Sequence, residues 1–297
     1  MSSAEPAVSV VIPAFNEGPR VGGVVAAVRG QLPDAEIIVV DDASRDDTAA
    51  QAAQAGARVI RRPHNLGNGA GVKTGIREAR GAAVVVIDAD GQHDPADIPR
   101  LLAQLERYDM VVAARPGRTS HENLIRWLGN SVLNALGTYL TGMPMRDLTS
   151  GFRAMRRAVM LEHLHLLPNQ FGWPMTSALA LAKAGHHIRF EATTMRRRQG
   201  GQSTQKLFTN GVRNVLIMLR MISLFAPLRI YFPAALLMLC GSLASFLVSF
   251  LLTDPGRLRV PNSAVGLFVG AVVVFMFGLL AEQIAALRLQ RAPRDEP

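Results

Sequence analysis

Residues 82–90 read Ala-Ala-Val-Val-Val-Ile-Asp-Ala-Asp, a pattern that indicates one class of fold. Six apolar residues in a row, rich in β-branched side chains, are typical of a strand that is buried on both faces, as in a parallel sheet. The strand delivers Asp88 and Asp90 to its carboxyl end. Ligands of open α/β sheets bind outside the carboxyl ends of the strands. The stretch therefore predicts a buried parallel strand and a ligand site at its end.

The segments around this strand alternate between strand and helix patterns. Apolar runs and breakers predict strands over residues 8–12, 36–40, 58–61, 82–87 and 109–114, and helices over residues 20–29, 44–55, 69–80, 123–139 and 174–184. Asp94 and Pro95 begin one further helix as its N-cap and first helical residue. This alternation with short links implies an α/β layered fold.

Polar side chains follow three of the predicted strands, as Asn16–Glu17, Asp41–Asp42 and the pair Asp88 and Asp90. Because alternate residues of a strand point to one side, Asp88 and Asp90 would present two oxygens to one cation. Two carboxylates together with phosphate oxygens are a usual way of holding Mg²⁺ or Mn²⁺. The alternative is that these are two loop aspartates that cap the next helix.

Other residue types that bind metals form no recognisable site in the sequence. His163 and His165 lie two residues apart on a short helix, and His186 precedes His187. Residues at i and i+2 of a helix do not face one metal, so we interpret these histidines as core or surface residues. The single cysteine, Cys240, excludes a disulfide framework and a cysteine-based metal site.

The charge distribution indicates a polyanionic neighbour. The 297 residues carry 32 Lys and Arg against 23 Asp and Glu, a net charge of +9. Residues 192–253 hold basic side chains and no acidic one. Such a region favours either nucleic acid or an anionic membrane surface.

Two apolar segments decide in favour of the membrane. Residues 230–253 carry no charge, and a helix of that length spans about 36 Å, enough for a hydrocarbon core of about 30 Å. A second run covers residues 264–281 and continues through Glu282 to Leu287. We predict two transmembrane helices; the alternative is a hydrophobic hairpin buried in a soluble protein.

The flanking charges predict the orientation of this pair. Arg220 and Arg229 precede it and Arg288 and Arg291 follow it, as the positive-inside tendency expects for cytoplasmic ends, although the connecting loop also carries arginines. The first residues lack the pattern of a signal peptide. We therefore expect an integral protein of the cytoplasmic membrane, with its α/β domain in the cytoplasm.

Four regions are predicted along the chain. Residues 1–203 form a cytoplasmic catalytic domain, 204–228 an amphipathic segment at the membrane interface, 229–288 a transmembrane hairpin and 289–297 a cytoplasmic tail. The amphipathic segment is predicted because apolar residues alternate there with Lys206, Arg213 and Arg220.

Six motifs, in order, carry a resemblance to a known family. They are Val-Ile-Pro-Ala-Phe-Asn-Glu (11–17), Val-Val-Asp-Asp-Ala-Ser (39–44), Asn-Leu-Gly-Asn-Gly (65–69), Asp-Ala-Asp-Gly-Gln-His-Asp-Pro (88–95), Asp-Leu-Thr-Ser-Gly-Phe-Arg (147–153) and Arg-Gln-Gly-Gly-Gln-Ser (198–203). With them the chain resembles the family 2 glycosyltransferases of GT-A fold, in particular the polyprenyl-phosphate sugar transferases typified by dolichol-phosphate mannose synthase. The resemblance implies a Rossmann-like GT-A domain, followed here by interfacial helices and the two C-terminal membrane helices.

The resemblance also implies roles for individual residues. Pro13, Glu17 and Asp42 would hold the nucleoside of a UDP- or GDP-sugar. Asp88, Asp90 and Gln92 would bind Mg²⁺ or Mn²⁺ on the diphosphate, which makes Asp90 catalytic as well. Arg115, Arg126 and Arg198 match arginines that grip the acceptor phosphate, a task suited to the guanidinium fork.

The implied reaction is inverting transfer of a sugar from a nucleotide sugar to a polyprenyl phosphate, dolichyl or undecaprenyl. An anionic phosphate needs no general base, in contrast to a hydroxyl acceptor. The expected partners are the sugar donor, the lipid acceptor and the membrane; a homo-oligomer is compatible with the sequence, and nucleic acid is not expected.

Three rival functions differ in their sequence signatures. A processive polysaccharide synthase would carry Gln-x-x-Arg-Trp, whereas Arg126-Trp127 has Asn123 at the glutamine position. A transferase that acts on a lipid hydroxyl would be distinguished by testing acceptors with and without a phosphate. A noncatalytic scaffold that binds nucleotide sugar should have lost its metal ligands, yet both aspartates and Gln92 are present.

Overall fold

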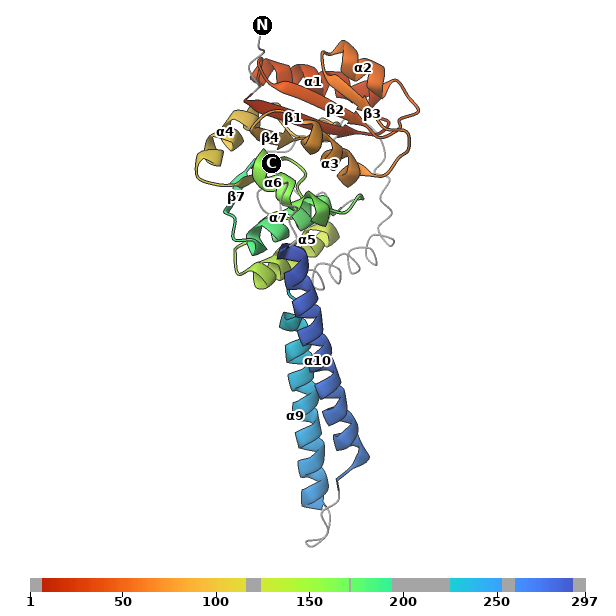
Figure 1. Cartoon of the computed structure of the whole chain (residues 1–297), viewed down its shortest axis with the longest axis vertical. Coiled ribbons are helices and arrows are strands. Elements are labelled where there is room, and N and C mark those ends of the chain that lie inside the picture. The colour runs from red at the N-terminus through yellow and green to blue at the C-terminus, as the bar shows by residue number, and fades with distance from the viewer. Residues whose placement is uncertain (1–6, 116–123, 171, 194–224, 253–259, 291–297) are drawn as a thin grey trace. The chain divides into compact units, whose positions relative to one another are not determined.

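The computed structural model describes residues 7–115, 124–170, 172–193, 225–252 and 260–290. The chain divides into two compact units, the first ending at Lys206 and the second covering Leu207–Ala292. Among the described residues, the first unit holds a sheet with its helices and the second holds two long helices (Figure 1).

The first unit is built on a seven-stranded sheet of order β3-β2-β1-β4-β6-β5-β7. Its strands are β1 (Val8–Ala14), β2 (Glu36–Asp41), β3 (Arg58–Arg61), β4 (Ala83–Val86), β5 (Met110–Ala114), β6 (Arg153–Arg156) and β7 (Ile188–Ala192). Among the strands of the described residues, only β6 runs antiparallel to its two neighbours, β4 and β5; the other pairings are parallel. The predicted α/β fold is confirmed, and the strand predicted over residues 82–87 is present as β4, with Val84 to Ile87 fully buried.

Helices cover both faces of this sheet, because the strands are apolar on both sides. The helices are α1 (Gly18–Gln31), α2 (Thr48–Gln54), α3 (Asn68–Glu78), α4 (Ile98–Ala103), α5 (Leu124–Thr141), α6 (Arg157–His163) and α7 (Trp173–Lys183), with the short 3₁₀ turns η1 (Pro95–Asp97), η2 (Gln104–Glu106) and η4 (Leu164–Leu166). Val10 and Ile12 share a buried cluster with residues of α1, α2 and α4. Gly75 of α3 lies against Val11, on the opposite face.

Local chemistry sets several helix boundaries. Asp94 caps η1 by accepting the N–H of Ala96 at 3.1 Å, as its position before Pro95 predicts. Helix α2 was expected from residue 44 and begins only at Thr48. The N–H of Ser44 is taken instead by Oδ1 of Asp41 at 3.0 Å, which holds the preceding residues in a turn.

Strands β6 and β7 were not expected from the sequence. Residues 153–156 form β6, which begins and ends with an arginine, and β7 carries charged Arg189 and Glu191. Neither strand is the apolar run that marks a buried strand. Their pairing partners, not their own composition, therefore determine these strands.

The second unit is a helical hairpin of α9 (Leu228–Leu252) and α10 (Asn262–Gln290). Both helices are long and apolar enough to cross a membrane, by length and composition. Ser242 donates its hydroxyl to the carbonyl of Ala264 at 2.7 Å, and Oε2 of Glu282 accepts the N–H of Leu228 at 3.1 Å. The acid that ends the second apolar run therefore caps the amino end of α9, where a negative charge is favourable.

Candidate active site

The turn after β1 is interlocked with the loop after β2. Asn16 adopts a left-handed conformation with φ of 54°, and its N–H donates to Oγ of Ser44 at 2.9 Å. The N–H of Arg45 donates in return to Oδ1 of Asn16 at 2.9 Å. Asparagine tolerates this conformation better than most residues. The polar turn predicted from the sequence is thus fixed against its neighbouring strand end.

Glu17 and Pro13 complete this turn. The N–H of Glu17 donates to Oγ1 of Thr48 at 2.9 Å, while its carboxylate pairs with Arg20 at 2.6 Å. Pro13 is buried in β1. Glu17 therefore joins the start of α1 to the start of α2, beside the predicted nucleoside site.

The carboxylate of Asp42 is buried and organises the glycine-containing loop. Its Oδ1 accepts the N–H of Leu66 at 3.1 Å and its Oδ2 accepts the N–H of Gly67 at 2.7 Å, while Arg62 lies 3.1 Å from Oδ1. Gly67 has φ of 101°, a conformation that favours glycine. A carboxylate offers about four lone pairs, so these three contacts leave room for one further donor.

An open hollow of about 420 Å³ adjoins this loop and is lined by Ala43, Ser44, Arg61, Arg62 and Pro63. Each of the two arginines pairs with an aspartate at the end of β2, Arg61 with Asp41 at 3.4 Å and Arg62 with Asp42 at 3.1 Å. Sequence reasoning missed both residues. Their position at the carboxyl end of β3 is the signal that could have identified them.

Asp88 lies just beyond β4 and rests against a glycine. Its side chain is 33% exposed, and Oδ2 lies 3.7 Å from Nε2 of buried His93. A Cβ placed on Gly151 would lie 2.9 Å from the same Oδ2. Only glycine at position 151 therefore leaves the carboxylate where it is.

Asp90 and Gln92 lie in the turn that follows. Oδ1 of Asp90 accepts the N–H of Gln92 at 3.1 Å, and Gly91 between them has φ of 74°. This hydrogen bond keeps Asp90 and Gln92 in one turn, which directly follows Asp88. The donor set is two carboxylates and an amide, all hard oxygen ligands, and it fits Mg²⁺ or Mn²⁺.

The segment 147–153 lies against Asp88 through Gly151 and is anchored by Arg153. The Arg153 side chain is fully buried; Nε donates to the carbonyl of Ser150 at 2.8 Å and NH2 to the carbonyl of Leu148 at 3.2 Å. Burial lowers the pKa of Arg153 to about 9, against the raising effect of Asp147, so its charge persists at pH 7. The neighbouring Phe152 ring packs on His93 with ring centres 5.1 Å apart.

Arg115 follows β5 and holds Asp147 with both prongs of its guanidinium. Nε donates to Oδ2 at 2.7 Å and NH2 to Oδ1 at 2.9 Å. Burial alone would raise the pKa of Asp147, but the hydrogen bonds and charge of Arg115 hold it below its usual value. The fork that was expected to grip a phosphate is thus engaged by a carboxylate, and sequence reasoning missed this pair.

The resemblance also implied roles for Arg126 and Arg198. The side chain of Arg126, on α5, and the whole of Arg198 lie outside the described residues. So does most of the predicted amphipathic segment at 204–228.

Two families match the chain. Residues 9–164 match Glycosyl transferase family 2, and residues 226–287 match the GtrB C-terminal hairpin. The first match covers β1 to α6, including all strand ends described above, and the second covers α9 and nearly all of α10.

Individual relatives support the same grouping. An uncharacterized glycosyltransferase of Mycobacterium tuberculosis (strain H37Rv) is 33% identical over 199 residues, which cover 66% of this chain and 88% of that protein. An undecaprenyl-phosphate 4-deoxy-4-formamido-L-arabinose transferase of Pseudomonas fluorescens (strain Pf0-1) is 33% identical over 165 residues, 52% of this chain and 48% of that protein.

A solved structure shares the fold. Glucosyl-3-phosphoglycerate synthase from Mycobacterium tuberculosis, in complex with Mn²⁺, UDP-glucose and phosphoglyceric acid, aligns with a TM-score of 0.58 and 23% identity, over 73% of this chain and 79% of that one. This likeness confirms the predicted GT-A fold.

Gly151→Ala tests the close contact between Gly151 and the carboxylate of Asp88. The new methyl group must displace the carboxylate, and a shift of about 1 Å at a reacting centre costs up to about 100-fold in rate. We expect kcat/KM for sugar transfer to fall by about 10- to 100-fold, with unchanged circular dichroism. Gly129→Ala in α5 is the matched control, because its methyl group meets nothing within 4 Å. Equal activity of the two variants would contradict a role for this contact.

Asp147→Asn tests the Arg115 pair. Removing one partner of a buried ion pair costs about 3 kcal/mol, so the melting temperature of the catalytic domain should fall by about 6–12 °C at pH 7. Because the folded pKa of Asp147 lies below the unfolded value of about 3.9, the pair stabilises above that pH and its contribution is lost as pH falls through the folded pKa. The difference between the two proteins should therefore shrink below about pH 4. A difference that stays constant down to pH 2 would be the contrary result.

Proposed function

The chain belongs to glycosyl transferase family 2 and is a glycosyltransferase, and we propose that it transfers a sugar from a UDP- or GDP-sugar to a polyprenyl phosphate at the cytoplasmic face of a membrane. The proposal rests mainly on one observation: the same chain carries carboxylates at the strand ends and a hairpin of two apolar helices. A water-soluble acceptor would need no such hairpin, whereas a polyprenyl chain stays in the bilayer. The match to the GtrB C-terminal hairpin and the lipid-phosphate transferase among the relatives support this choice.

The donor would bind along the carboxyl edge of β1, β2 and β4. Pro13, Glu17 and Asp42 would hold the nucleoside, with the remaining lone pair of Asp42 accepting from the base. The synthase of similar fold was solved with Mn²⁺ and UDP-glucose, which supports a nucleotide donor here.

Asp88, Asp90 and Gln92 would hold a divalent cation against the diphosphate. When bound, such a cation neutralises the charge that develops on the leaving nucleotide. The carboxylate of Asp88 is partly open to solvent and backed by Gly151, so it can be presented to a ligand without rearrangement of the backbone.

The acceptor phosphate is already anionic at pH 7, so no general base is required. The protein has to align a phosphate oxygen with the anomeric carbon and to balance the charges that meet there. Direct displacement inverts the anomeric centre. We assign Arg126 and Arg198 to the phosphate clamp, while Arg115, held by Asp147, fixes the loop after β5 beside the same site.

A stripe on α5 supports work at a membrane surface. Leu128, Val132 and Tyr139 are 57%, 49% and 50% exposed, and their spacing of four and seven residues places them on one helix face. A continuous exposed apolar face is unusual for a free surface. It fits the interface of a bilayer, where a lipid acceptor would be presented.

An acceptor panel tests the reaction class. Full-length protein in lipid nanodiscs is incubated with Mn²⁺, labelled UDP- and GDP-sugars, and either undecaprenyl phosphate or undecaprenol. We expect labelled lipid only with the phosphate, in the β configuration. Transfer to undecaprenol at a comparable rate would favour the lipid-hydroxyl alternative, and failure with every donor would favour the noncatalytic scaffold.

Asp90→Ala tests the metal ligands. Stabilisation of the leaving group by a cation is worth several kcal/mol, so we expect turnover to fall by at least about 100-fold. Asp94→Ser is the matched control, since serine can still cap η1. An Asp90→Ala protein with near-normal activity would overturn the assignment, and chelation of the wild type should mimic the variant.

A further inference from the structure

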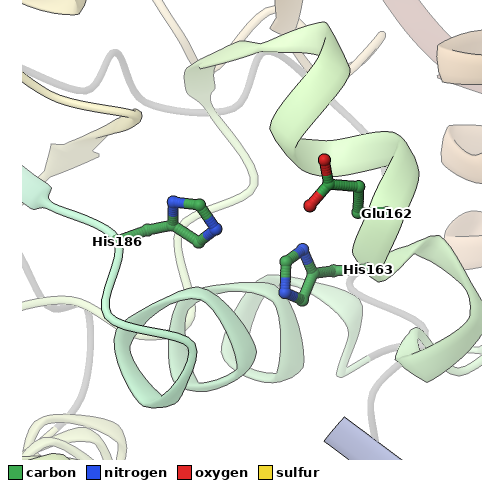
Figure 2. Close-up of side chains that lie close together, drawn as sticks. All are labelled: Glu162, His163 and His186. Carbon is green, nitrogen blue, oxygen red and sulfur yellow. The ribbon is translucent and has the colours of Figure 1, made fainter. Parts of the chain in front are cut away.

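Three side chains that can bind a metal gather at the far edge of the sheet from the donor site. Glu162 and His163 end α6, and His186 lies in the turn between α7 and β7. One ligand atom from each lies within 4.8 Å of the other two. Figure 2 shows the three side chains around one common space. The histidine partner that sequence reasoning did not find for His163 is therefore His186, not His165.

The ring of His163 is already oriented as a metal ligand would be. Its Nδ1 lies 2.9 Å from the carbonyl oxygen of Val159. A carbonyl can only accept, so Nδ1 carries the proton and Nε2 keeps its lone pair. Histidines that bind metals almost always donate their other ring N–H to a carbonyl or a carboxylate.

The ring of His186 lies near a carboxylate. Its Nδ1 lies 3.5 Å from Oδ2 of Asp109, the residue before β5. Asp109 is itself held in place, because Oδ2 accepts the N–H of His187 at 2.9 Å. A carboxylate on this side of the imidazole favours a proton on Nδ1, which again leaves Nε2 for a cation.

The chemistry of the three ligands selects the ion. Two imidazoles and one carboxylate suit Zn²⁺, whereas Mg²⁺ and Mn²⁺ prefer oxygen ligands. Ligand atoms of a tetrahedral zinc ion lie about 3.3 Å apart, so the side chains must close by about 1.5 Å. Glu162 is exposed and His186 is partly exposed, so both side chains have room to move.

The position of the cluster indicates a structural ion. Asp109 and His186 precede β5 and β7, which run parallel to β4, so they lie at the amino edge of the sheet. The donor site lies at the carboxyl edge. We propose that Glu162, His163 and His186 bind one Zn²⁺ ion, which ties α6 to the turn before β7 and takes no part in sugar transfer.

Zinc titration of the full-length protein tests the proposal. The protein is prepared without a polyhistidine tag, stripped of metal, and titrated calorimetrically with Zn²⁺ in excess Mg²⁺, which occupies oxygen-rich sites. We expect one high-affinity site in the wild type and in Asp90→Ala. Co²⁺ substituted at that site should give the visible absorption of a four-coordinate ion. Absence of a micromolar or tighter site in the wild type would overturn the proposal.

Two substitutions and one control assign the site. His186→Gln and Glu162→Gln keep the side-chain size and should each weaken Zn²⁺ binding by at least about 10-fold. His187→Gln, the exposed neighbour, should bind as the wild type does. Zn²⁺ should raise the melting temperature of the wild type and of His187→Gln but not of His186→Gln, because binding to the folded state alone stabilises it. Wild-type affinity in both His186→Gln and Glu162→Gln would contradict the assignment.

Discussion

A buried guanidinium must satisfy its hydrogen bonds inside the protein, and much of the candidate site depends on how Arg153 does so. It donates to the carbonyls of Ser150 and Leu148 and to the hydroxyl of Ser177, and its face lies 5.4 Å from the centre of the Trp173 ring. Leaving such a charge unpaired costs several kcal/mol, so the backbone before it has little freedom. The segment 147–152 is consequently rigid, and it presents Gly151 to Asp88 and Asp147 to Arg115.

The antiparallel direction of β6 brings this segment to the site. Arg153 pairs with Val86 of β4 and with Val112 of β5, and both of those strands run the other way. The start of β6 therefore lies at the carboxyl edge of its neighbours, where an α/β sheet binds its ligand. The end of β6 lies at the opposite edge, where Arg156 comes within 3.8 Å of Asp109 beside the proposed zinc ligands. The one reversed strand thus has its start at the candidate active site and its end beside the proposed zinc ligands.

Much of the fold could be predicted from the sequence, because strong local signals determine it: the apolar run before Asp88, the cap at Asp94 and the uncharged segment after Arg229. What was missed depends on pairing between distant residues. The strand β6 has arginines at both ends, and its position is determined by the strands that it pairs with. No local sequence pattern indicates that the carboxylate of Asp147 would bind the guanidinium of Arg115. The engagement of Asp42 by the N–H groups of Leu66 and Gly67 is of the same kind, as is the meeting of His163 with His186. The composition of a segment and the spacing of its apolar residues indicate which face it buries, but not which distant residue it contacts.

In the proposed function, the carboxylates beyond β4 join a cation to the diphosphate of a nucleotide sugar. Calorimetric titration of the full-length protein with UDP and with GDP, with and without Mn²⁺, tests this role. We expect one of the two nucleotides to bind in a Mn²⁺-dependent way, and Asp88→Asn to abolish the dependence on Mn²⁺ while the melting temperature changes little. Binding of the nucleotide with equal affinity in the presence and absence of Mn²⁺, or by Asp88→Asn as by the wild type, would contradict it.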